Sequence, residues 1–307
     1  MIKVVFFSSS ERALPILETL QKKFELLALV SPPSVADTLA TKSNFFVLKT
    51  TKLGPKEISW IISKKPDIMV SAYFGLYIPE KLVNFNKLGI INIHPSLLPR
   101  WRGPSPVQAA IATGDKITGV TFIKMDEEFD HGPILAQIEE KIKRGDTQES
   151  LYKRLFKVAA ETLPFILTNY CEGKLSLTQQ NHAKATYCKI IKKEDGYIKP
   201  QVIKGALEGN LPSQNFSIPF IKDSSVPLVP EILERYIRAL SPWPGVYTWI
   251  VENPKSKIKK YKRLKILKAH IEKDKLALDD VQLEGKKPVI WKQFRQGYPH
   301  FEFCEKI

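Results

Sequence analysis

The sequence predicts an α/β fold: a mostly parallel β-sheet covered by helices, followed by a second domain built as a small β-barrel. Three patterns predict it. Apolar runs alternate with helical patterns in the first half of the chain, a polar stretch follows near residue 187, and short strands separated by polar turns come after it. With 307 residues, of which 43% are hydrophobic, the chain is long enough to build two substantial cores.

Apolar runs predict the first four strands. Residues 2–7 (IKVVFF) form the first, and LLALV, DIMVSAY and LGIINIH form the next three. Ser8 and Glu11 have capping-box spacing ahead of the helical pattern ALPILETLQKK, and KEISWIISKK is helical before the third strand. Strands joined through helices form right-handed βαβ units, so the sheet is expected to be mostly parallel. The first turn, FFSSSERAL, has no GxGxxG motif, which argues against an NAD site.

The remaining elements lie on both sides of a predicted boundary. Before it come the helix PVQAAIATG, the strands GVTFIKM and PILAQIEEKI with the turn DEEFDHG between them, and the long helix ESLYKRLFKVAAETLPFILTNYCEG. After it come an irregular loop rich in Pro and Ser, the helix PEILERYIRAL and the strands GVYTWIVEN, RLKILKAHI and KLALDDVQL. We therefore expect a first domain over 1–186, a linker over 187–205 and a C-terminal domain over 206–307.

The cysteines and the N-terminus indicate a cytoplasmic protein. Cys171, Cys188 and Cys304 are far apart, odd in number and without a CxxC pair, so neither a disulfide framework nor a zinc site is suggested. The N-terminal MIKVVFFSSS lacks the pattern of a signal peptide. No apolar run reaches the roughly 18 residues of a membrane span, so no membrane partner is expected.

The charge of the chain indicates a polyanionic partner. The formal net charge is +15, and residues 255–275 hold ten Lys and Arg against two acidic residues. A strand there would present basic side chains suited to a nucleic-acid backbone beside Tyr261. These side chains are Lys260, Lys262, Arg263 and Lys265. A solvated edge strand protected by lysines is the alternative.

The stretch NIHPSLLPRWRG carries the candidate chemistry. Asn92 and His94 end a strand two residues apart, so both point to one side of the sheet, at the strand end where open α/β sheets bind ligands. An amide N–H donates to a developing oxyanion, and a neutral imidazole accepts a proton. The pair suits acyl transfer without a covalent enzyme intermediate, because no GxSxG motif or cysteine accompanies it. A histidine with a structural role is the alternative.

An imidazole in this role needs a carboxylate that orients it and favours its protonated form. Asp130, in the turn between two predicted strands, is the first candidate. Asp126, Glu127 and Glu128 are close enough in the sequence to remain alternatives.

These motifs resemble a known family. NIHPSLLPRWRG, followed by GVTFIKMDEEFDHGPIL, is similar to the signature of the folate-dependent formyltransferases. Within them, the Trp of LLPRWRG, PVQAAI, YIRALSPWPGVYTWI and VQLEGKKP resemble the methionyl-tRNA formyltransferase family. The likeness runs from residue 2 nearly to the end. It implies a Rossmann-like formyltransferase domain followed by a small OB-like β-barrel domain that binds tRNA.

The resemblance implies formyl transfer from 10-formyltetrahydrofolate to the α-amino group of methionine on initiator tRNA. The catalytic residues of the family fall on Asn92, His94 and Asp130. Asn92 and protonated His94 would stabilise the oxyanion, His94 would relay protons, and Asp130 would hold His94 and raise its pKa. No metal is implied, and we expect a monomer.

The resemblance also implies two sets of binding residues. For the folate they are Phe74, Gly75, Leu76, Ile78, Ser96, Leu97, Leu98, Pro99 and Asp126. For tRNA they are Arg100, Trp101, Arg102, Lys260, Lys262, Arg263 and Lys265. Core packing is the alternative for Phe74 to Ile78, and an internal carboxylate partner is the alternative for Arg100 and Arg102.

The sequence departs from the family in three places. The first turn carries Ser8-Ser9-Ser10 instead of Gly-Thr-Pro, and the stretch around 203–228 holds extra Pro and Ser. The loop SPPSVADTLATKSNFF has one basic residue, Lys42, where the family has a long basic loop. This keeps tRNA selectivity open and retains an amino-sugar nucleotide as an alternative acceptor. A further alternative, a nucleic-acid-binding protein on an inactive enzyme scaffold, conflicts with the intact Asn-His-Asp set.

Overall fold

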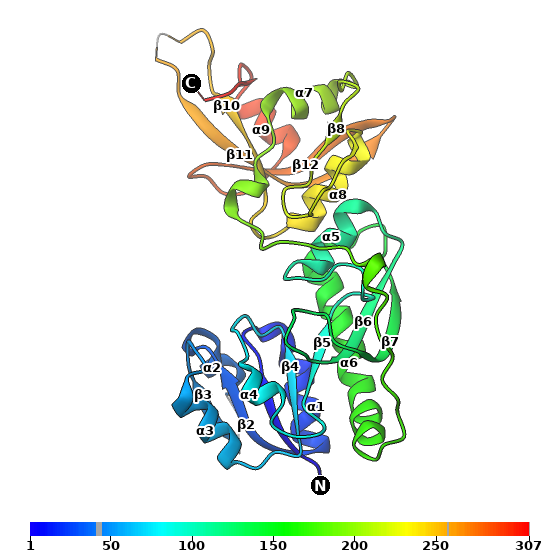
Figure 1. Ribbon diagram of the computed structural model, residues 1–307. Coiled ribbons are helices and arrows are strands. Elements are labelled where there is room, and N and C mark those ends of the chain that lie inside the picture. The colour runs from blue at the N-terminus through cyan, green and yellow to red at the C-terminus, as the bar shows by residue number, and fades with distance from the viewer. Residues whose placement is uncertain (41–44, 257, 307) are drawn as a thin grey trace. The chain divides into compact units, whose positions relative to one another are not determined.

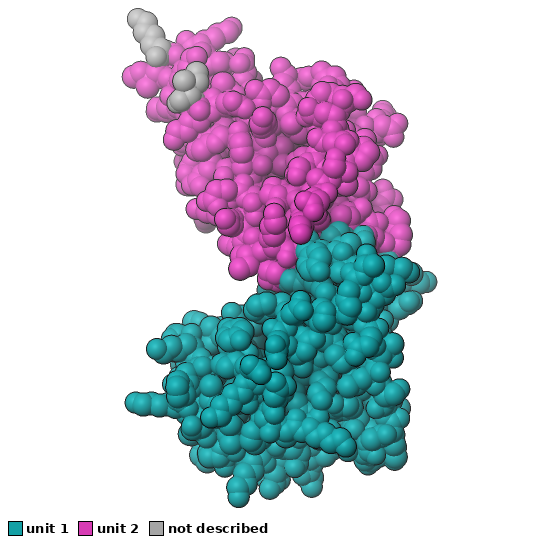
Figure 2. Space-filling model, in the orientation of Figure 1, with its two compact units in different colours: residues 1–103, 117–141, 152–187 teal, residues 104–116, 142–151, 188–307 magenta. Residues whose placement is uncertain are grey.

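A computed structural model describes residues 1–40, 45–256 and 258–306 (Figure 1). The chain divides into two compact units, which Figure 2 distinguishes by colour. The first unit comprises residues 1–103, 117–141 and 152–187, and the second comprises residues 104–116, 142–151 and 188–307. Lys42 of the loop after the second strand and Lys257 of the basic segment lie outside the described residues.

The first unit is built on a seven-stranded sheet in the order β3-β2-β1-β4-β5-β6-β7. Its strands are β1 (Lys3–Phe7), β2 (Glu25–Ser31), β3 (Phe46–Lys49), β4 (Ile68–Ala72), β5 (Ile90–His94), β6 (Ile117–Lys124) and β7 (Ile134–Lys141). The first five run parallel, and β6 and β7 are antiparallel to their neighbours. The mostly parallel α/β sheet expected from the sequence is confirmed. The turn between β6 and β7 is short, and only antiparallel neighbours can be joined in that way.

Helices connect the strands of this sheet and bury its apolar runs. They are η1 (Glu11–Ala13), α1 (Leu14–Lys23), α2 (Pro33–Leu39), α3 (Pro55–Ser63), α4 (Glu80–Val83) and η2 (His182–Lys184). α6 (Gln148–Cys171) begins in a segment of the second unit and continues in the first. One core cluster packs Val5 and Phe7 of β1 against Val30 of β2, Ile61 of α3 and Met69 of β4.

The capping box expected at Ser8 and Glu11 is wrong. Ser10 is the N-cap of the 3₁₀ turn η1, and its side chain accepts a hydrogen bond from the backbone N–H of Arg12. The fully buried Ser8 instead donates its hydroxyl to the Ser10 carbonyl. A 3₁₀ turn therefore comes before α1, and it moves the cap two residues beyond the position that the capping-box spacing predicts.

The strand order reverses between β1 and β4, which are parallel neighbours in the sheet. β1 pairs with β2 on one side and with β4 on the other, so the segments that follow β1 and β4 diverge at their carboxyl ends. Ser9 bridges the two segments: its N–H donates to the Tyr73 carbonyl, and its hydroxyl accepts from the Gly75 N–H at 3.1 Å. Such reversal points are where open α/β sheets hold their ligands.

The second unit contains a five-stranded antiparallel sheet in the order β13-β12-β11-β10-β14. Its strands are β10 (Val246–Val251), β11 (Tyr261–Glu272), β12 (Lys275–Leu283), β13 (Val289–Ile290) and β14 (Glu302–Phe303), and its helices are α5 (Pro106–Thr113), η3 (Lys193–Gly196), α7 (Pro200–Glu208), α8 (Pro230–Leu240) and α9 (Trp291–Gly297). The three expected strands are thus present. α7 begins inside the expected linker, and a short hairpin of β8 (Asn215–Phe216) and β9 (Val226–Pro227) lies in the expected irregular loop.

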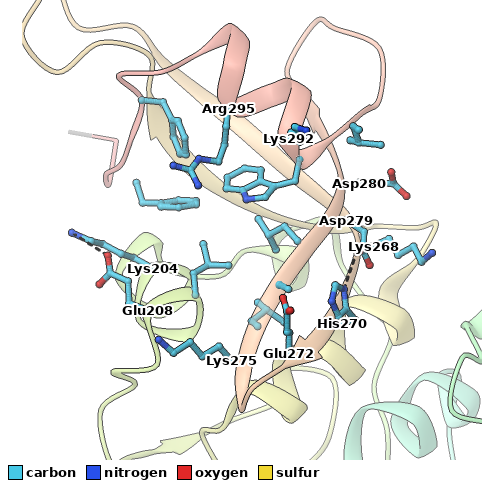
Figure 3. Close-up of a pocket in the computed structure, with 18 of the residues that line it drawn as sticks. Lys204, Glu208, Lys268, His270, Glu272, Lys275, Asp279, Asp280, Lys292 and Arg295 are labelled. Carbon is cyan, nitrogen blue, oxygen red and sulfur yellow. Dashed lines mark hydrogen bonds and ion pairs between the residues drawn. The ribbon is translucent and has the colours of Figure 1, made fainter.

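A groove of about 1460 Å³ opens on the second unit (Figure 3). Six Lys and Arg side chains line it together with five Asp and Glu side chains, so its charges are nearly balanced. Among the residues that line it, His270 Nδ1 of β11 lies 2.9 Å from Asp279 Oδ1 of β12. All residues that line the groove belong to the second unit, and none belongs to the Asn92, His94 and Asp130 set.

Within the described residues, every helix is too short or too polar to traverse a lipid bilayer. No group of three or more His, Cys, Asp and Glu side chains there is arranged to hold a metal ion.

Candidate active site

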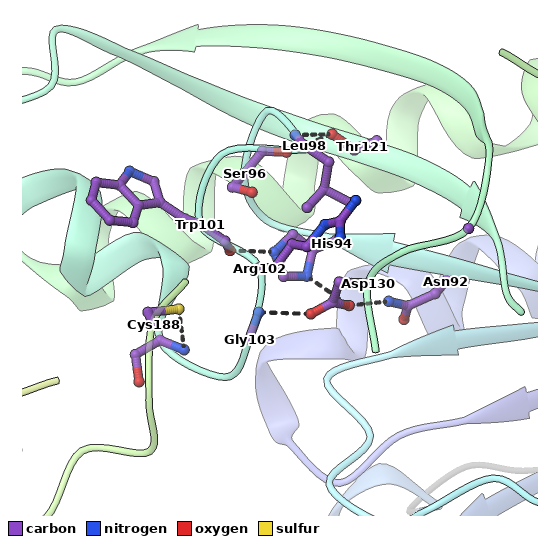
Figure 4. A network of polar contacts seen from close by, with 12 residues as sticks. Asn92, His94, Ser96, Leu98, Trp101, Arg102, Gly103, Thr121, Asp130 and Cys188 are labelled. Carbon is purple, nitrogen blue, oxygen red and sulfur yellow. Dashed lines mark hydrogen bonds and ion pairs between the residues drawn. The ribbon is translucent and has the colours of Figure 1, made fainter. Parts of the chain in front are cut away.

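Asn92 and His94 extend from the carboxyl end of β5 toward the carboxylate of Asp130 (Figure 4). The alternation of side chains along a strand places both on one side of the sheet, as the sequence predicts. The Asn92 Nδ2 atom donates to Asp130 Oδ1 at 3.3 Å, and His94 Nδ1 lies 3.3 Å from the same oxygen. One carboxylate oxygen therefore joins the amide and the imidazole.

The turn between β6 and β7 holds Asp130 in an unusual backbone conformation. Its φ angle is +53°, in the left-handed region that few non-glycine residues adopt. Gly132 follows closely, and a Cβ atom there would come within 1.9 Å of the Lys124 carbonyl oxygen. The backbone N–H of Gly103 donates to Asp130 Oδ2 at 2.8 Å. A conformation of this kind persists only where the surroundings hold it in place.

His94 is buried, with 4% of its surface exposed, and both ring nitrogens have polar neighbours. Nε2 lies 2.9 Å from the Trp101 carbonyl oxygen, and a carbonyl only accepts, so Nε2 carries a proton. Burial alone would lower the pKa of His94, but the charge of Asp130 and the hydrogen bond to it outweigh burial, and the pKa is raised. The surroundings thus favour the imidazolium form of the ring.

Asp130 shows the opposite shift. Burial alone would raise the pKa of this carboxyl, but the charge of His94, its hydrogen bond and the bond from the Gly103 N–H lower it. The carboxylate and the imidazolium favour each other's charged forms. The Asn92 amide and the His94 imidazolium thus place N–H groups and a positive charge at the end of β5. This set can stabilise negative charge that develops on a carbonyl oxygen.

The segment after His94 is fixed by buried hydrogen bonds and has a cis peptide bond between Leu98 and Pro99. The Leu98 N–H donates to the Thr121 hydroxyl at 3.1 Å, and the Thr121 hydroxyl donates to the Ser96 carbonyl at 2.6 Å. Gln137 of β7 donates to the Leu98 carbonyl. Strands β6 and β7 therefore hold the loop that leads from His94 to Trp101.

The sequence of this chain is similar to those of known proteins. A family model described as formyl transferase matches residues 22–167. The methionyl-tRNA formyltransferase of Treponema denticola is 33% identical to this protein over an alignment that covers 98% of each chain. The chain belongs to the methionyl-tRNA formyltransferase family.

Two solved structures share the fold of this family member. Methionyl-tRNA formyltransferase from Clostridium thermocellum has a TM-score of 0.59 at 18% identity, over 92% of this chain and 99% of that chain. HypX from Aquifex aeolicus, solved in complex with tetrahydrofolic acid, has a TM-score of 0.59 at 16% identity, over 96% of this chain and 47% of that chain.

The structure also separates Asp130 from the three acidic alternatives. Asp126 lies 2.7 Å from His131 Nδ1 instead of His94. Glu128 is 75% exposed at its side chain and lies 3.9 Å from His131 Nε2, and Glu127 is exposed. Of the four acidic residues in this turn, Asp130 is the one that reaches the imidazole of His94.

The residues that the family resemblance assigns to the folate occupy two kinds of position. Gly75 is exposed and has no atom within 4 Å of a Cβ position, and Leu76 is half-buried. Ile78 is buried in the core cluster, and Phe74 packs on that cluster with its ring 5.4 Å from that of Phe7. The loop after β4 thus combines an open backbone with side chains anchored in the core.

The segment from Ser96 to Pro99 contributes through its backbone. Ser96 is fully buried and donates its hydroxyl to the Arg100 carbonyl, and Leu98 is buried as well. Leu97 and Pro99 are half-buried.

Arg102 is not placed as the family resemblance implies. Only 3% of it is exposed, and its guanidinium donates to the Gln180 side chain and contacts His182 Nδ1 at 2.8 Å. A surface phosphate cannot reach a guanidinium buried in this way, so the expected tRNA contact of Arg102 is wrong. Trp101 is also buried, and Arg100 is exposed with its guanidinium over the Trp101 ring at 4.2 Å. Of the three residues, Arg100 remains a surface cation.

The basic strand is only partly available for a polyanion. Lys262 forms an ion pair with Glu252 at 3.3 Å, and Arg263 forms one with Glu284 at 2.5 Å. The hydrogen bonds from Arg263 lower the pKa of Glu284. Within the described residues, Lys260 and Lys265 have no ion-pair partner. Strand alternation also separates Lys262 from Arg263 and Lys265, so the four cations do not share one face.

Sequence reasoning missed the backbone of Trp101 and Gly103 and the side chain of Gln180. Trp101 and Gly103 both have a positive φ, 62° and 109°, and they aim a carbonyl at His94 and an N–H at Asp130. The glycine of the RWRG motif signals a special turn. Gln180 lies in a polar stretch without periodicity, and nothing in its local pattern distinguishes it from Gln179.

Proposed function

We propose that this chain transfers a formyl group from 10-formyltetrahydrofolate to the α-amino group of methionyl initiator tRNA, giving N-formylmethionyl-tRNA for translation initiation. Family membership supports formyl transfer to methionyl-tRNA. The observation that carries the assignment of the site is the carboxylate of Asp130, which contacts both the Asn92 amide and the His94 imidazole.

10-Formyltetrahydrofolate supplies the formyl carbonyl that the amine attacks. The Asn92 Nδ2 atom has two N–H bonds, and one of them donates to Asp130, so the second is available to the formyl oxygen. The positive charge of His94 stabilises the negative charge that develops on that oxygen. Asp130 keeps His94 protonated and fixes the direction of its ring.

His94 is also the group proposed to move the proton that the amine loses to the departing folate nitrogen. Both of its ring nitrogens are engaged, Nδ1 with Asp130 and Nε2 with the Trp101 carbonyl. Proton transfer by Nε2 therefore requires that the contact with Trp101 opens. Catalytic hydrogen bonds commonly rearrange in this way when substrate binds.

The proposed folate pocket lies at the reversal point of the sheet, beside the loop after β4. Phe74, Gly75, Leu76 and Ile78 would flank the pterin, Asp126 would lie opposite, and the segment from Ser96 to Pro99 would shape the pocket through its backbone. The exposed backbone at Gly75 fits this role, because its open side leaves room for close approach of a planar ring.

The C-terminal antiparallel sheet is proposed to act as an OB-like, tRNA-binding domain, with the domain boundaries expected from the sequence. Arg100, Lys260 and Lys265 are the candidate phosphate contacts that the structure leaves on the surface. Lys262 and Arg263 would act only if tRNA competes with Glu252 and Glu284. The protein is proposed to be a cytoplasmic monomer.

The test is formylation of methionyl initiator tRNA by the purified protein with 10-formyltetrahydrofolate, beside an elongator methionyl-tRNA. Asn92→Ala removes one oxyanion donor and is expected to lower kcat by about a hundred- to a thousandfold. Formation of product on both tRNAs would place selectivity outside this chain. No product on either tRNA, with folate binding intact, would contradict the acceptor and direct the search to amino-sugar nucleotides.

A further inference from the structure

Gln180 is a buried amide whose hydrogen-bonding groups are all used. Only 5% of this residue is exposed. Its Nε2 atom donates to the Asp130 carbonyl at 2.9 Å and to the Gly132 carbonyl at 2.8 Å. Its Oε1 atom accepts from Arg102 Nε at 3.2 Å and from Arg102 Nη2 at 2.7 Å. Two donors and one acceptor thus join two separate loops.

These two loops are the ones that orient the candidate catalytic groups. On one side, Gln180 holds the backbone on both sides of His131, including that of Asp130 with its φ of +53°. On the other side it holds Arg102, whose neighbours Trp101 and Gly103 contact His94 Nε2 and Asp130 Oδ2. Gln180 touches none of the groups that would contact substrate.

We infer that Gln180 is a positioning residue for formyl transfer, which joins the Asp130 turn to the Trp101–Gly103 segment through Arg102 and so fixes the distance between Asp130 and His94. The inference rests on the proposed function, because it assigns these two side chains to the reaction.

The physical basis is the cost of a left-handed conformation at Asp130. A non-glycine residue with positive φ relaxes unless neighbouring contacts hold it. The two N–H groups of Gln180 supply such contacts within the turn, on both sides of His131, and Arg102 anchors the other end of the amide. The guanidinium of Arg102 is itself fixed, because His182 Nδ1 lies 2.8 Å from Nη2 and the Arg102 N–H donates to the Thr186 carbonyl at 2.8 Å.

Two substitutions separate the contact of Gln180 with Arg102 from its contacts with the Asp130 and Gly132 carbonyls. Gln180→Glu keeps an oxygen for Arg102 but places a carboxylate oxygen against the Asp130 and Gly132 carbonyls, which only accept. Gln180→Met keeps the approximate volume of the side chain and removes both sets of hydrogen bonds. Gln179→Met is the matched control, because Gln179 is the neighbouring residue, is exposed and has no described side-chain partner.

Formylation kinetics, thermal unfolding and the NMR titration of the His94 ring are measured for the wild type and the three variants. We expect both Gln180 variants to stay folded and to lose about ten- to a hundredfold in kcat, because small displacements of catalytic groups cost this much. The KM for the formyl donor should change little. The pKa of His94 should fall in both, since Asp130 no longer sits at its side, while Gln179→Met matches the wild type.

A kcat within about twofold of the wild type in both Gln180 variants would overturn the inference, and so would a lower kcat with an unchanged His94 titration. If both variants fail to fold, Gln180 is a folding residue and the inference is also wrong. A wild-type protein that does not formylate methionyl-tRNA contradicts the proposed function alone, because the His94 titration still reports whether Gln180 positions the pair.

Discussion

Two His–Asp pairs, one in each unit, have different surroundings. In the first unit, His94 and Asp130 lie 3.3 Å apart with 5% and 14% of their side chains exposed. In the second unit, His270 and Asp279 lie 2.9 Å apart on the groove, with 52% and 28% exposed. The shorter pair is the more exposed one. Distance alone therefore does not distinguish the two pairs, whereas burial and further hydrogen-bond partners do.

The difference has an energetic basis. Breaking a buried pair by removing one partner costs about 3–5 kcal/mol, because it leaves an uncompensated charge. Exposed pairs contribute about 0–1 kcal/mol, because water replaces the lost partner. The buried pair can therefore hold an imidazole in one orientation and one charge state. In the exposed pair, water can replace either partner, so the imidazole is held less firmly.

The largest expected effect is that of Asp130→Asn, and the same substitution at Asp279 in the other pair is its control. Asp130→Asn removes the charge that keeps His94 protonated and should lower kcat for formylation by about a hundred- to ten-thousandfold. Asp279→Asn should leave kcat unchanged, since none of the site residues lines the groove. Steady-state kinetics of both variants test this. Equal losses in both would mean that burial does not distinguish the two pairs.

The second prediction concerns pH and stability. Folding raises the pKa of His94. Its contribution to the unfolding free energy is therefore complete below the unfolded-state pKa of about 6.5 and is lost as pH rises through the folded-state pKa. Folding lowers the pKa of Asp130. Its contribution to the unfolding free energy is therefore present above the unfolded-state pKa of about 3.9 and is lost as pH falls through the folded-state pKa. The unfolding free energy lost in Asp130→Asn, measured with urea, should be larger at pH 5.5 than at pH 9. The same difference for Asp279→Asn should stay below about 1 kcal/mol at both values.

The third prediction tests the turn that carries Asp130. A Cβ atom on Gly132 would lie 1.9 Å from the Lys124 carbonyl oxygen, so Gly132→Ala forces the backbone to move and should cost about 1–3 kcal/mol of stability. Formylation should fall with it, because Asp130 shifts. Gly145→Ala is the control: no atom lies within 4 Å of its Cβ position. A Gly132→Ala variant as stable as Gly145→Ala would show that the turn is not tightly held.

The comparison of the two regions also explains what sequence could predict. The strands β4 and β5 are apolar runs, and Asn92 and His94 follow from their spacing at a strand end, because strand geometry is local. Gly103 and Trp101 act through backbone groups, and Gln180 acts across the fold 50 residues from Asp130. Such partners depend on tertiary packing and leave no local pattern.

The ion pairs of the basic strand could not be predicted from the sequence for a related reason. Counting Lys and Arg in residues 255–275 indicates a basic strand, but Glu252 and Glu284 lie on neighbouring segments and neutralise two of its cations. Cross-strand pairing depends on register, which charge counting does not include. α7 was missed although Pro200 at its first position and Gly209 at its C-cap are recognised boundary signals.

The smallest expected effect concerns this surface and its proposed tRNA contacts. The double variant of Lys260→Gln and Lys265→Gln removes two cations that have no ion-pair partner within the described residues. The double variant of Arg263→Gln and Glu284→Gln removes an ion pair and leaves the net charge unchanged. Each lysine that contacts a phosphate should contribute just under one unit to the slope of log affinity against log salt concentration.

Binding of methionyl-tRNA is therefore measured at several salt concentrations for both double variants. We expect the lysine variant to bind severalfold more weakly and with a shallower slope, since fewer counterions are released. The paired variant should keep the wild-type slope, because Glu284 already compensates Arg263. A slope that falls equally in both would mean that tRNA displaces Glu284 from Arg263. In that case Arg263 can leave its ion pair with Glu284 and contact a phosphate, because the pair is exposed. The buried pair of His94 and Asp130 cannot exchange partners in this way.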